Sequence, residues 1–193
     1  MMARAFLFSL VALAACTREQ PPAPELQPDV YPLEVGYRWE YRSEIGLKVV
    51  REVKRTVREN GKEWYEMTFT LPLVGDHSLL MHRDTEGILA RRKKREQRIM
   101  RFPLKPGETW TIDFPGEDLA VCTVEEPEEL EILDKKISCS RVRVERKNRK
   151  SGRMNRDLEW YAEGIGLVKM TVTMMKVTQT FTLHSFTTPE NSP

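Results

Sequence analysis

Apolar and polar side chains alternate with a period of two through most of the chain after residue 30, and this pattern constrains the fold more than any other feature. In residues 37–42 three aromatic residues alternate with three charged ones, and similar alternation recurs over 65–71, 109–114 and 168–174. Successive side chains of a β-strand point to opposite faces of the sheet, so each run predicts a half-buried strand.

Glycines fall between these runs, notably at Gly61, Gly87, Gly152 and 164–166, where they predict hairpin turns. No segment has the apolar stripe of a long amphipathic helix. Short strands separated by turns predict an all-β fold: a curved antiparallel sheet or open, barrel-like meander, with little or no helix beyond the first fifteen residues.

Residues 49–58 predict a less regular strand, because valines and arginines share one parity and the other parity is also charged. Neither face is purely apolar. Two explanations fit this pattern: a strongly curved sheet in which arginine stems cover apolar surface, or an edge strand protected by its charges.

A nine-residue pattern occurs twice. Residues 31–39 read Tyr-Pro-Leu-Glu-Val-Gly-Tyr-Arg-Trp, and 71 residues later 102–110 read Phe-Pro-Leu-Lys-Pro-Gly-Glu-Thr-Trp. Proline favours an extended approach, glycine permits a turn and tryptophan provides a large inward anchor, so we interpret the repeat as a device that starts a strand. A ligand-binding repeat is the alternative. The repetition predicts a sheet built from two similar halves.

The first sixteen residues have the layout of a secretion signal. An apolar run of 11 residues, 5–15, follows Arg4 and ends in the tetrapeptide Leu-Ala-Ala-Cys, whose cysteine is Cys16. Eleven residues are too few to span a bilayer, which takes about 20, and they match the apolar core of a signal peptide. An ordinary secreted protein with an incidental Cys16 would share this layout.

The tetrapeptide resembles the lipobox of bacterial lipoproteins. The resemblance implies that the signal peptide 1–15 is removed, that Cys16 carries the lipid, and that this lipid anchors the chain to a membrane of the cell envelope. Thr17 stands where inner-membrane lipoproteins of enteric bacteria have aspartate. The resemblance therefore favours the outer membrane, with the protein facing the periplasm.

These features divide the chain into four parts. After the signal peptide, the lipidated N-terminus and a tether occupy 16–30, which contains four prolines and almost no large apolar side chains. In polyproline II, at about 3.1 Å per residue, the part of the tether after Cys16 would reach roughly 43 Å. A single antiparallel β-domain follows over 31–188, and we expect 189–193 to be a disordered tail.

Charge is segregated along the chain although the formal net charge is only +2. Segment 91–101 has seven basic residues and one acidic residue, segment 141–156 has eight and one, and 113–134 has nine acidic residues and no basic one. These blocks either neutralise one another across neighbouring strands and at hairpin ends, or the two basic segments contact an envelope protein, anionic lipid or anionic polymer. The near-neutral total argues against nucleic acid as a partner.

Two cysteines remain besides Cys16, namely Cys122 and Cys139. Disulfides persist in oxidising compartments, and both residues lie in strand-like sequence on either side of the acidic stretch 125–134, so we predict a disulfide between them. The alternative is a pair of buried free thiols.

Residues 160–169 read Trp-Tyr-Ala-Glu-Gly-Ile-Gly-Leu-Val-Lys and, together with 31–39, resemble a family of bacterial envelope proteins of unknown function. Its members look like lipoproteins or secreted β-domains that open with Pro-Leu-x-x-Gly-x-x-Trp and close with a Tyr-Ala-x-Gly-x-Gly-x-Val-Lys hairpin. Glu163 stands where the family commonly has proline. The resemblance covers most of 31–186 and brings no catalytic residues with it.

The sequence predicts neither an enzyme nor a cofactor or metal site, because it contains no catalytic triad, phosphate-binding loop or zinc-ligand spacing. We therefore expect a non-enzymatic envelope lipoprotein that acts as a binding or interaction module. The alternative is a carrier of a lipid or other apolar ligand on the concave face of the sheet. Five aromatic residues would line that face: Tyr37, Trp39, Tyr65, Trp110 and Trp160.

Overall fold

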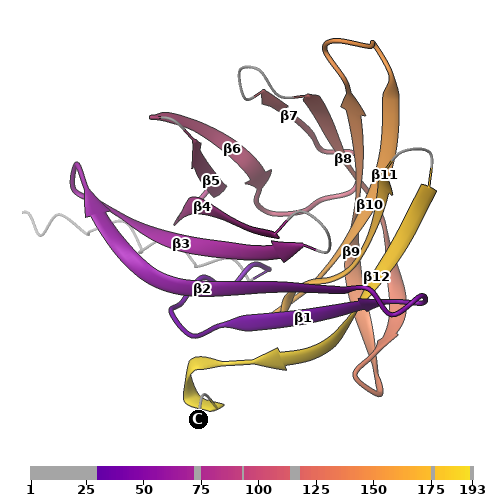
Figure 1. The fold of residues 1–193 in the computed structure, drawn as a ribbon, viewed down its shortest axis with the longest axis horizontal. Coiled ribbons are helices and arrows are strands. Elements are labelled where there is room, and N and C mark those ends of the chain that lie inside the picture. The colour runs from indigo at the N-terminus through magenta and orange to yellow at the C-terminus, as the bar shows by residue number, and fades with distance from the viewer. Residues whose placement is uncertain (1–29, 72–74, 93, 114–117, 175–176, 192–193) are drawn as a thin grey trace, which may run out of the picture.

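The computed structural model describes residues 30–71, 75–92, 94–113, 118–174 and 177–191. The predicted signal peptide, the lipid attachment residue Cys16 and all of the tether except Val30 lie outside these ranges. Within them the chain forms twelve β-strands and one turn of 3-10 helix (Figure 1).

The strands follow one another along the chain, joined by turns. They are β1 (Arg38–Ser43), β2 (Lys48–Glu59), β3 (Lys62–Leu71), β4 (Gly75–Asp84), β5 (Gly87–Arg92), β6 (Arg95–Arg101), β7 (Thr109–Asp113), β8 (Leu119–Ile132), β9 (Lys135–Lys147), β10 (Met154–Ala162), β11 (Gly166–Met174) and β12 (Val177–Thr187).

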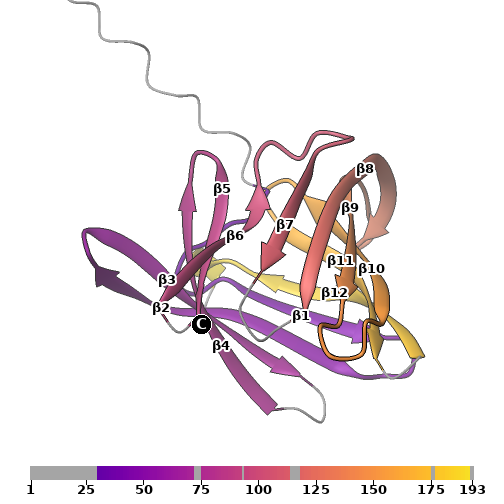
Figure 2. The same cartoon turned by 90° about the horizontal axis from the view of Figure 1, so that it is seen from above.

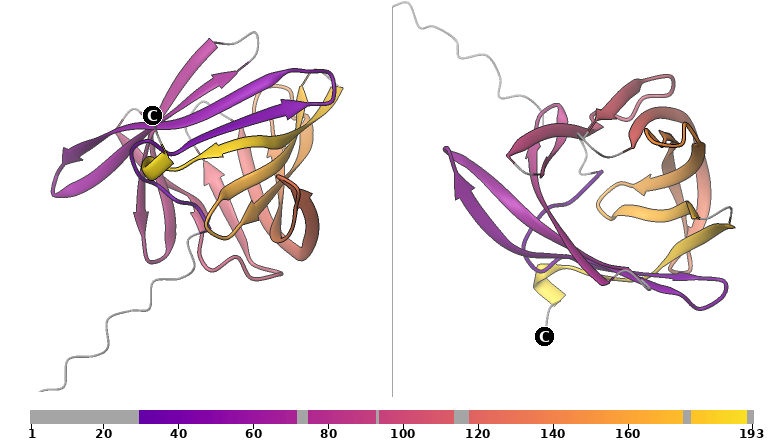
Figure 3. Two further views of the ribbon diagram at one scale, coloured as in Figure 1. Left: turned by 90° about the horizontal axis from the view of Figure 1, so that it is seen from below. Right: turned by 45° about the horizontal axis from the view of Figure 1, so that its top comes forward.

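All twelve strands belong to one antiparallel sheet, in the order β6-β5-β4-β3-β2-β1-β12-β11-β10-β9-β8-β7. Consecutive strands are neighbours in each half of this order, and β1 joins the halves by pairing with β12. The sheet curls until its two outermost strands, β6 and β7, lie beside one another (Figures 2 and 3). The prediction of an all-β, curved antiparallel fold is confirmed.

Burial broadly follows the period-two pattern that predicted the strands, although Glu40 of β1 is buried along with its neighbours. Trp39 and Tyr41 of β1 are 2% and 0% exposed, whereas Arg42 is exposed to solvent. In β3, Met67 is fully buried between half-buried Glu66 and Thr68. Side chains of this kind from both halves of the sheet form one hydrophobic core.

The mixed strand predicted at 49–58 lies within β2, between β1 and β3, and is therefore not an edge strand. The guanidinium of Arg51 lies 5.6 Å from the ring centroid of Tyr41 and 5.3 Å from that of Phe69. Of the two explanations for this strand, the correct one is a curved sheet in which an arginine stem covers apolar side chains.

The two copies of the nine-residue repeat make equivalent backbone hydrogen bonds. Gly36 N donates to Val53 O and Gly107 N donates to Val124 O, at 3.0 and 2.9 Å, and each valine N–H donates to the residue after the glycine. Both glycines have a positive φ, which costs glycine little. The repeat therefore starts β1 in one half, β1–β6, and β7 in the other, β7–β12.

These halves meet at two junctions, which are held in different ways. At one junction β12 pairs with β1 along the whole of Arg38–Ser43. At the other, between β6 and β7, the described residues form no backbone ladder. Instead, Trp110 Nε1 donates to Ile99 O at 2.9 Å and Gln97 Nε2 donates to Thr111 O at 3.2 Å. We call this side-chain junction the seam.

At the C-terminal end, the disordered tail expected at 189–193 stays a prediction. Pro189–Asn191 forms one turn of 3-10 helix, and residues 192–193 lie outside the described ranges. Across the described ranges, no helix has the length and apolar character needed to cross a bilayer.

Candidate functional site

Most arginines of the basic segment 141–156 lie against carboxylates of neighbouring strands. Arg141 shows the arrangement: its Nε lies 2.8 Å from Glu125 Oε2 and its Nη1 lies 3.2 Å from Glu128 Oε2, both on β8. The arginines of this segment that form ion pairs are Arg141, Arg143, Arg146, Arg149 and Arg156. Neutralisation across neighbouring strands, one of the two interpretations of the charge pattern, therefore holds for this part of the sheet.

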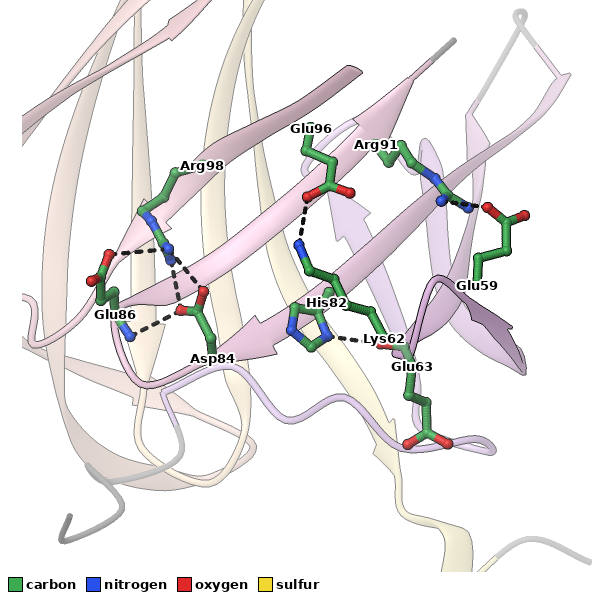
Figure 4. Close-up of polar contacts among 9 residues, drawn as sticks. All are labelled: Glu59, Lys62, Glu63, His82, Asp84, Glu86, Arg91, Glu96 and Arg98. Carbon is green, nitrogen blue, oxygen red and sulfur yellow. Dashed lines mark hydrogen bonds and ion pairs between the residues drawn. The ribbon is translucent and has the colours of Figure 1, made fainter. Parts of the chain in front are cut away.

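The other basic segment, 91–101, is neutralised in part (Figure 4). Arg91 Nη1 lies 2.6 Å from Glu59 Oε2. Arg98 donates two hydrogen bonds of 2.8 Å to Asp84 and lies 3.2 Å from Glu86. The hydrogen bond from Arg98 is the main cause that lowers the pKa of the Asp84 carboxyl. These side chains are engaged with each other and leave little charge for an outside partner.

A buried tryptophan on the same face explains why two cations are held there. Trp64 is 0% exposed, and its ring centroid lies 4.5 Å from the Arg91 guanidinium and 5.8 Å from Lys62 Nζ. The His82 ring packs 5.5 Å away, and His82 Nδ1 lies 2.8 Å from Glu63 O (Figure 4). The long stems of the two cations shield the indole from water, so this cluster is a packing unit.

Four basic side chains at two hairpin ends have no such partners. Lys94 and Arg95, at the end of the β5–β6 hairpin, and Lys150 and Arg153, in the β9–β10 turn, are exposed. None of them forms an ion pair with a residue that the structure describes. We call these four side chains the basic tips. In Figure 1, β6 starts at the upper left and the β9–β10 hairpin lies at the upper right.

Three large apolar side chains at three different hairpin ends are exposed. Met154, the first residue of β10, and Val177, the first residue of β12, are each 56% exposed. Ile45, in the β1–β2 turn, is 68% exposed. Met154 directly follows Arg153, one of the basic tips, whereas Val177 and Ile45 lie at other hairpin ends.

The three tryptophans predicted to line an apolar-ligand site are buried in separate places. Trp39, Trp110 and Trp160 are 2%, 6% and 5% exposed. Each indole N–H donates to a different acceptor: Ile165 O at 2.6 Å, Ile99 O at 2.9 Å and Glu128 Oε2 at 2.9 Å, respectively. Their contacts are those of core and seam side chains.

The two predicted tyrosines are half-buried and also lie apart. Tyr37 stacks on Trp39, with 5.8 Å between the ring centroids. Tyr65 donates its hydroxyl to Glu63 at 3.0 Å. Of the five predicted lining residues, the structure therefore brings together Tyr37 and Trp39.

A cavity of about 300 Å³ lies elsewhere, and none of these five aromatic residues lines it. Its lining residues are Val30, Phe102, Pro103, Leu104, Pro127, Ser138, Ser140, Tyr161 and Glu163. Three of them belong to the second copy of the repeat. A second hollow, of about 350 Å³, lies at the seam and is lined by charges of both signs, including Arg98, Arg101, Glu86 and Glu108.

A polar network on β10 and its neighbours was not predicted from the sequence. Asp157 is 3% exposed and accepts hydrogen bonds from Arg146 and, at 2.8 Å, from Thr173 N. Two residues on, Glu159 accepts a hydrogen bond of 2.6 Å from the Tyr161 hydroxyl, and burial raises the pKa of Tyr161. The sequence did contain a sign of this network. Asp157, Glu159 and Tyr161 occupy every second position of one strand, so all three face the same side of the sheet.

Glu40 is a second buried carboxylate, on β1, and it is 7% exposed. Its side chain lies 2.6 Å from Lys48 Nζ, 3.1 Å from Arg42 Nη2 and 3.8 Å from Arg38 Nη1. The hydrogen bond from Lys48 is the largest of the effects that lower the pKa of Glu40, and burial acts in the opposite direction.

Cys122 and Cys139 form no disulfide, so the prediction of a bridge is wrong. Both are free thiols, 2% and 0% exposed. They lie on adjacent strands, but Cys122 is opposite Val144, five residues along β9 from Cys139. At about 3.3 Å per residue this offset is roughly 17 Å, whereas a disulfide needs Cα atoms within about 7 Å. Burial raises the pKa of Cys122 to about 12 and that of Cys139 to about 11.

No protein-family model matches this chain, and no curated protein matches it. Among solved structures it is similar to a Bacteroides fragilis protein, provisionally described as exported, that has a YmcC-like fold. The TM-score is 0.54, with 13% sequence identity over 82% of this chain and 98% of that one. The chain shares its overall fold with that protein. At this identity the likeness concerns the fold alone.

Two further solved structures have lower TM-scores against this chain. One is a Parabacteroides distasonis protein provisionally described as a lipoprotein, with a TM-score of 0.49 and 11% identity over 82% of this chain and 98% of that chain. The other is the hypothetical lipoprotein YmcC of Escherichia coli, with a TM-score of 0.43 and 15% identity over 81% of this chain and 85% of that chain.

Proposed function

We propose that this protein is a lipoprotein of the bacterial cell envelope, anchored through a lipid on Cys16 and facing the periplasm from the outer membrane. The lipobox resemblance and the apolar run at 5–15 support the anchor. The shared fold with a protein described as exported supports a location outside the cytoplasm. The proline-rich tether would allow the β-domain to move up to roughly 43 Å from the bilayer.

Its role is that of a non-enzymatic binding module that contacts an anionic surface of the envelope through the basic tips. The observation that carries this proposal is the difference in pairing among the basic residues. Arg91 and the arginines of β9 and β10 are held by carboxylates, whereas Lys94, Arg95, Lys150 and Arg153 are exposed and unpaired among the described residues. Unpaired charges on projecting turns extend a positive potential into solvent, where it attracts anionic groups.

The proposal predicts how strongly the basic tips contribute to binding. A lysine or arginine near an anionic bilayer contributes about 1 kcal/mol. Replacing all four basic tips by glutamine should therefore cost about 4 kcal/mol, or roughly three orders of magnitude in affinity. Co-sedimentation of a Cys16→Ser form with vesicles of zwitterionic lipid, with and without anionic phosphatidylglycerol, measures this loss. Salt at about 1 M should weaken binding of the native form, because the screening length falls to about 3 Å.

A matched control separates the basic tips from net charge. Glutamine at Arg55, Arg58, Arg149 and Arg156 removes the same four charges, but each of these arginines forms an ion pair in the structure. We expect this control to bind anionic vesicles nearly as well as the native protein. Equal losses in the two variants would contradict the proposal, because binding would then depend on total charge.

The anchor is tested separately by fractionation of the native bacterium. The native chain should be found in the outer-membrane fraction without residues 1–15, and Cys16→Ser should release it into the soluble periplasmic fraction. A chain that keeps its first fifteen residues, or that remains in the cytosol, would overturn the assignment as a lipoprotein.

A carrier of a lipid or other apolar ligand is the second candidate, and the cavity of about 300 Å³ favours it. This volume lies at the small end of the range for ligand sites and suits a small ligand better than an acyl chain with its headgroup. Native mass spectrometry of the protein from its own host decides the point. A co-purifying lipid would place the carrier function ahead of the contact function.

A further inference from the structure

The cavity of about 300 Å³ has two chemically different walls. The apolar wall consists of Val30, Phe102, Pro103, Leu104 and Pro127. Ser138, Ser140, Tyr161 and Glu163 form the polar wall. A concave apolar surface with a few converging polar groups is the usual composition of a site for a small molecule.

The backbone brings the polar groups of this cavity together. Ser138 and Ser140 share a parity on β9, so both side chains face the same side of the sheet. Ser140 is directly opposite Tyr161 on β10, and Glu163 follows β10 in the turn to β11. Residues from two adjacent strands and one turn therefore converge on the cavity.

The fold itself does not use most of these polar groups. Neither the Ser138 nor the Ser140 hydroxyl has a hydrogen-bond partner among the residues that the structure describes. Within the same residues, the Glu163 carboxylate has no ion-pair or hydrogen-bond partner. Tyr161 is engaged, because its hydroxyl donates to Glu159. Two hydroxyls and one carboxylate are thus available to a ligand.

Charge selects the kind of ligand. Among the residues that the structure describes, Glu163 is the only charged residue that lines this cavity, and no lysine or arginine does. A carboxylate beside a partly apolar cavity attracts cations and repels anions. An ammonium group has three N–H donors, which equals the number of available acceptors: one carboxylate and two hydroxyls.

We propose that this cavity binds a small organic cation. Its ammonium group pairs with Glu163 and donates hydrogen bonds to Ser138 and Ser140, and its apolar body contacts Phe102 and Leu104. This site goes beyond the contact function, because none of the basic tips lines the cavity.

Three probes of one shape test the proposal: butylammonium, 1-butanol and butyrate. The mature lipoprotein in zwitterionic nanodiscs is titrated with each probe, and backbone amide shifts are followed by NMR. Butylammonium should shift the amides of Ser138, Ser140 and Glu163 saturably. The alcohol should bind at least tenfold more weakly, and butyrate should leave these amides unshifted.

Variants of the protein identify the group that selects the cation. Glu163→Gln should weaken butylammonium binding about tenfold, which corresponds to about 1.4 kcal/mol. Glu44→Gln is the matched control, since Glu44 is an exposed turn residue that does not line the cavity. Ser140→Ala should cost a few-fold in affinity.

Equal binding of butylammonium and 1-butanol would overturn the proposal, as would an unchanged affinity in Glu163→Gln or an equal loss in Glu44→Gln. The amide spectrum of each variant shows directly whether it is folded. Vesicle binding should be the same in Glu163→Gln as in the native protein, so this test and the test of the basic tips can fail independently.

Discussion

Replacement of Gly87 by alanine should disrupt the pairing of β5 with β6. Gly87 is the first residue of β5 and has a φ of 141°. A Cβ at this position would lie 2.0 Å from Met100 O, 2.8 Å from Met100 C and 2.9 Å from Arg101 Cα. Carbon and oxygen atoms in close contact are normally about 3.3 Å apart. All three obstacles are backbone atoms, so no side chain can rotate away, and β6 must move by more than about 1 Å.

The loss of stability in Gly87→Ala can be worked out from the contacts between β5 and β6. Gly87 is opposite Arg101, and Ile88, which is 0% exposed, is opposite Met100, which is 4% exposed. Displacing β6 would weaken backbone hydrogen bonds that contribute about 1 kcal/mol each. It would also expose part of two side chains whose full burial contributes about 1.5 to 3 kcal/mol each. With about 1 kcal/mol for the positive φ, we expect a loss of more than 4 kcal/mol.

Gly152→Ala provides the matched control. Gly152 lies in the β9–β10 turn with a φ of 69°, and no atom of the part of the chain that the structure describes lies within 4 Å of a Cβ built there. The free energy of unfolding of Gly152→Ala should therefore fall only by the cost of a left-handed conformation, about 1 to 2 kcal/mol. Urea unfolding followed by tryptophan fluorescence measures both variants. Free energies of unfolding that agree within about 1 kcal/mol would refute the steric reasoning, since that difference is well below the expected gap.

Three further measurements test other parts of the structure. Tyr41→Phe removes a buried hydrogen bond of 2.9 Å to a backbone carbonyl, so urea unfolding should show a loss of about 1 to 3 kcal/mol. Glu40→Gln should cost about 1 to 2 kcal/mol at pH 7. Lys48 and other cations lower the pKa of Glu40 in the folded state. The stability that ionised Glu40 contributes is therefore present above the unfolded pKa of 4.5 and disappears as the pH falls below it. A difference in unfolding free energy between Glu40→Gln and the native protein that stays constant down to pH 2 would contradict the assignment. Cys122 and Cys139 should react with a thiol reagent only after denaturation, because both are buried. A mass of the native protein that is two hydrogens below the mass of the reduced chain would indicate the disulfide that the register excludes.

The sequence was sufficient to predict the strands because alternation is a local property. Residues 65–71 alternate strictly, and they lie in β3 with Met67 fully buried. The strand at 49–58 shows where the local pattern becomes ambiguous. Arg51 alternates with the polar positions of this strand and so shares a face with its valines. The sequence pattern was equally compatible with an edge strand and with an arginine whose stem covers apolar side chains. Knowing that β2 lies between β1 and β3 removes the ambiguity, and strand order depends on residues far away in the chain.

Register could not be predicted, and the disulfide prediction failed for this reason. Cys122 and Cys139 do lie on adjacent antiparallel strands, as the sequence indicated. Whether they could bond depends on which residues are opposite one another, and the pairing of β8 with β9 is shifted between Glu125 and Glu128. Two thiols on paired strands can therefore be separated along the ladder by more than a disulfide can span.

The same dependence on register determines which basic residues remain available to a partner. The sequence showed two basic segments of similar composition, but the first part of 141–156 lies in β9, which pairs with the acidic β8, and the last part lies in β10, on the other side of β9. Its strand arginines meet carboxylates, whereas Lys150 and Arg153 lie in a turn beyond the ladder. Composition thus predicts that charges will pair, and strand order and register decide which carboxylate each arginine meets.

The seam shows a limit of the sequence repeat itself. The repeat starts β1 and β7 in the same way, so two equivalent junctions between the halves would be expected. The strands that come back to meet them differ, because β12 has 11 residues and β6 has 7. The longer strand pairs with all of β1, whereas the shorter one meets β7 through Trp110 and Gln97. Residues outside the repeat determine the length and curvature of the strands. The two copies of the repeat therefore start β1 and β7 in the same way, but one junction is a backbone ladder and the other is the seam.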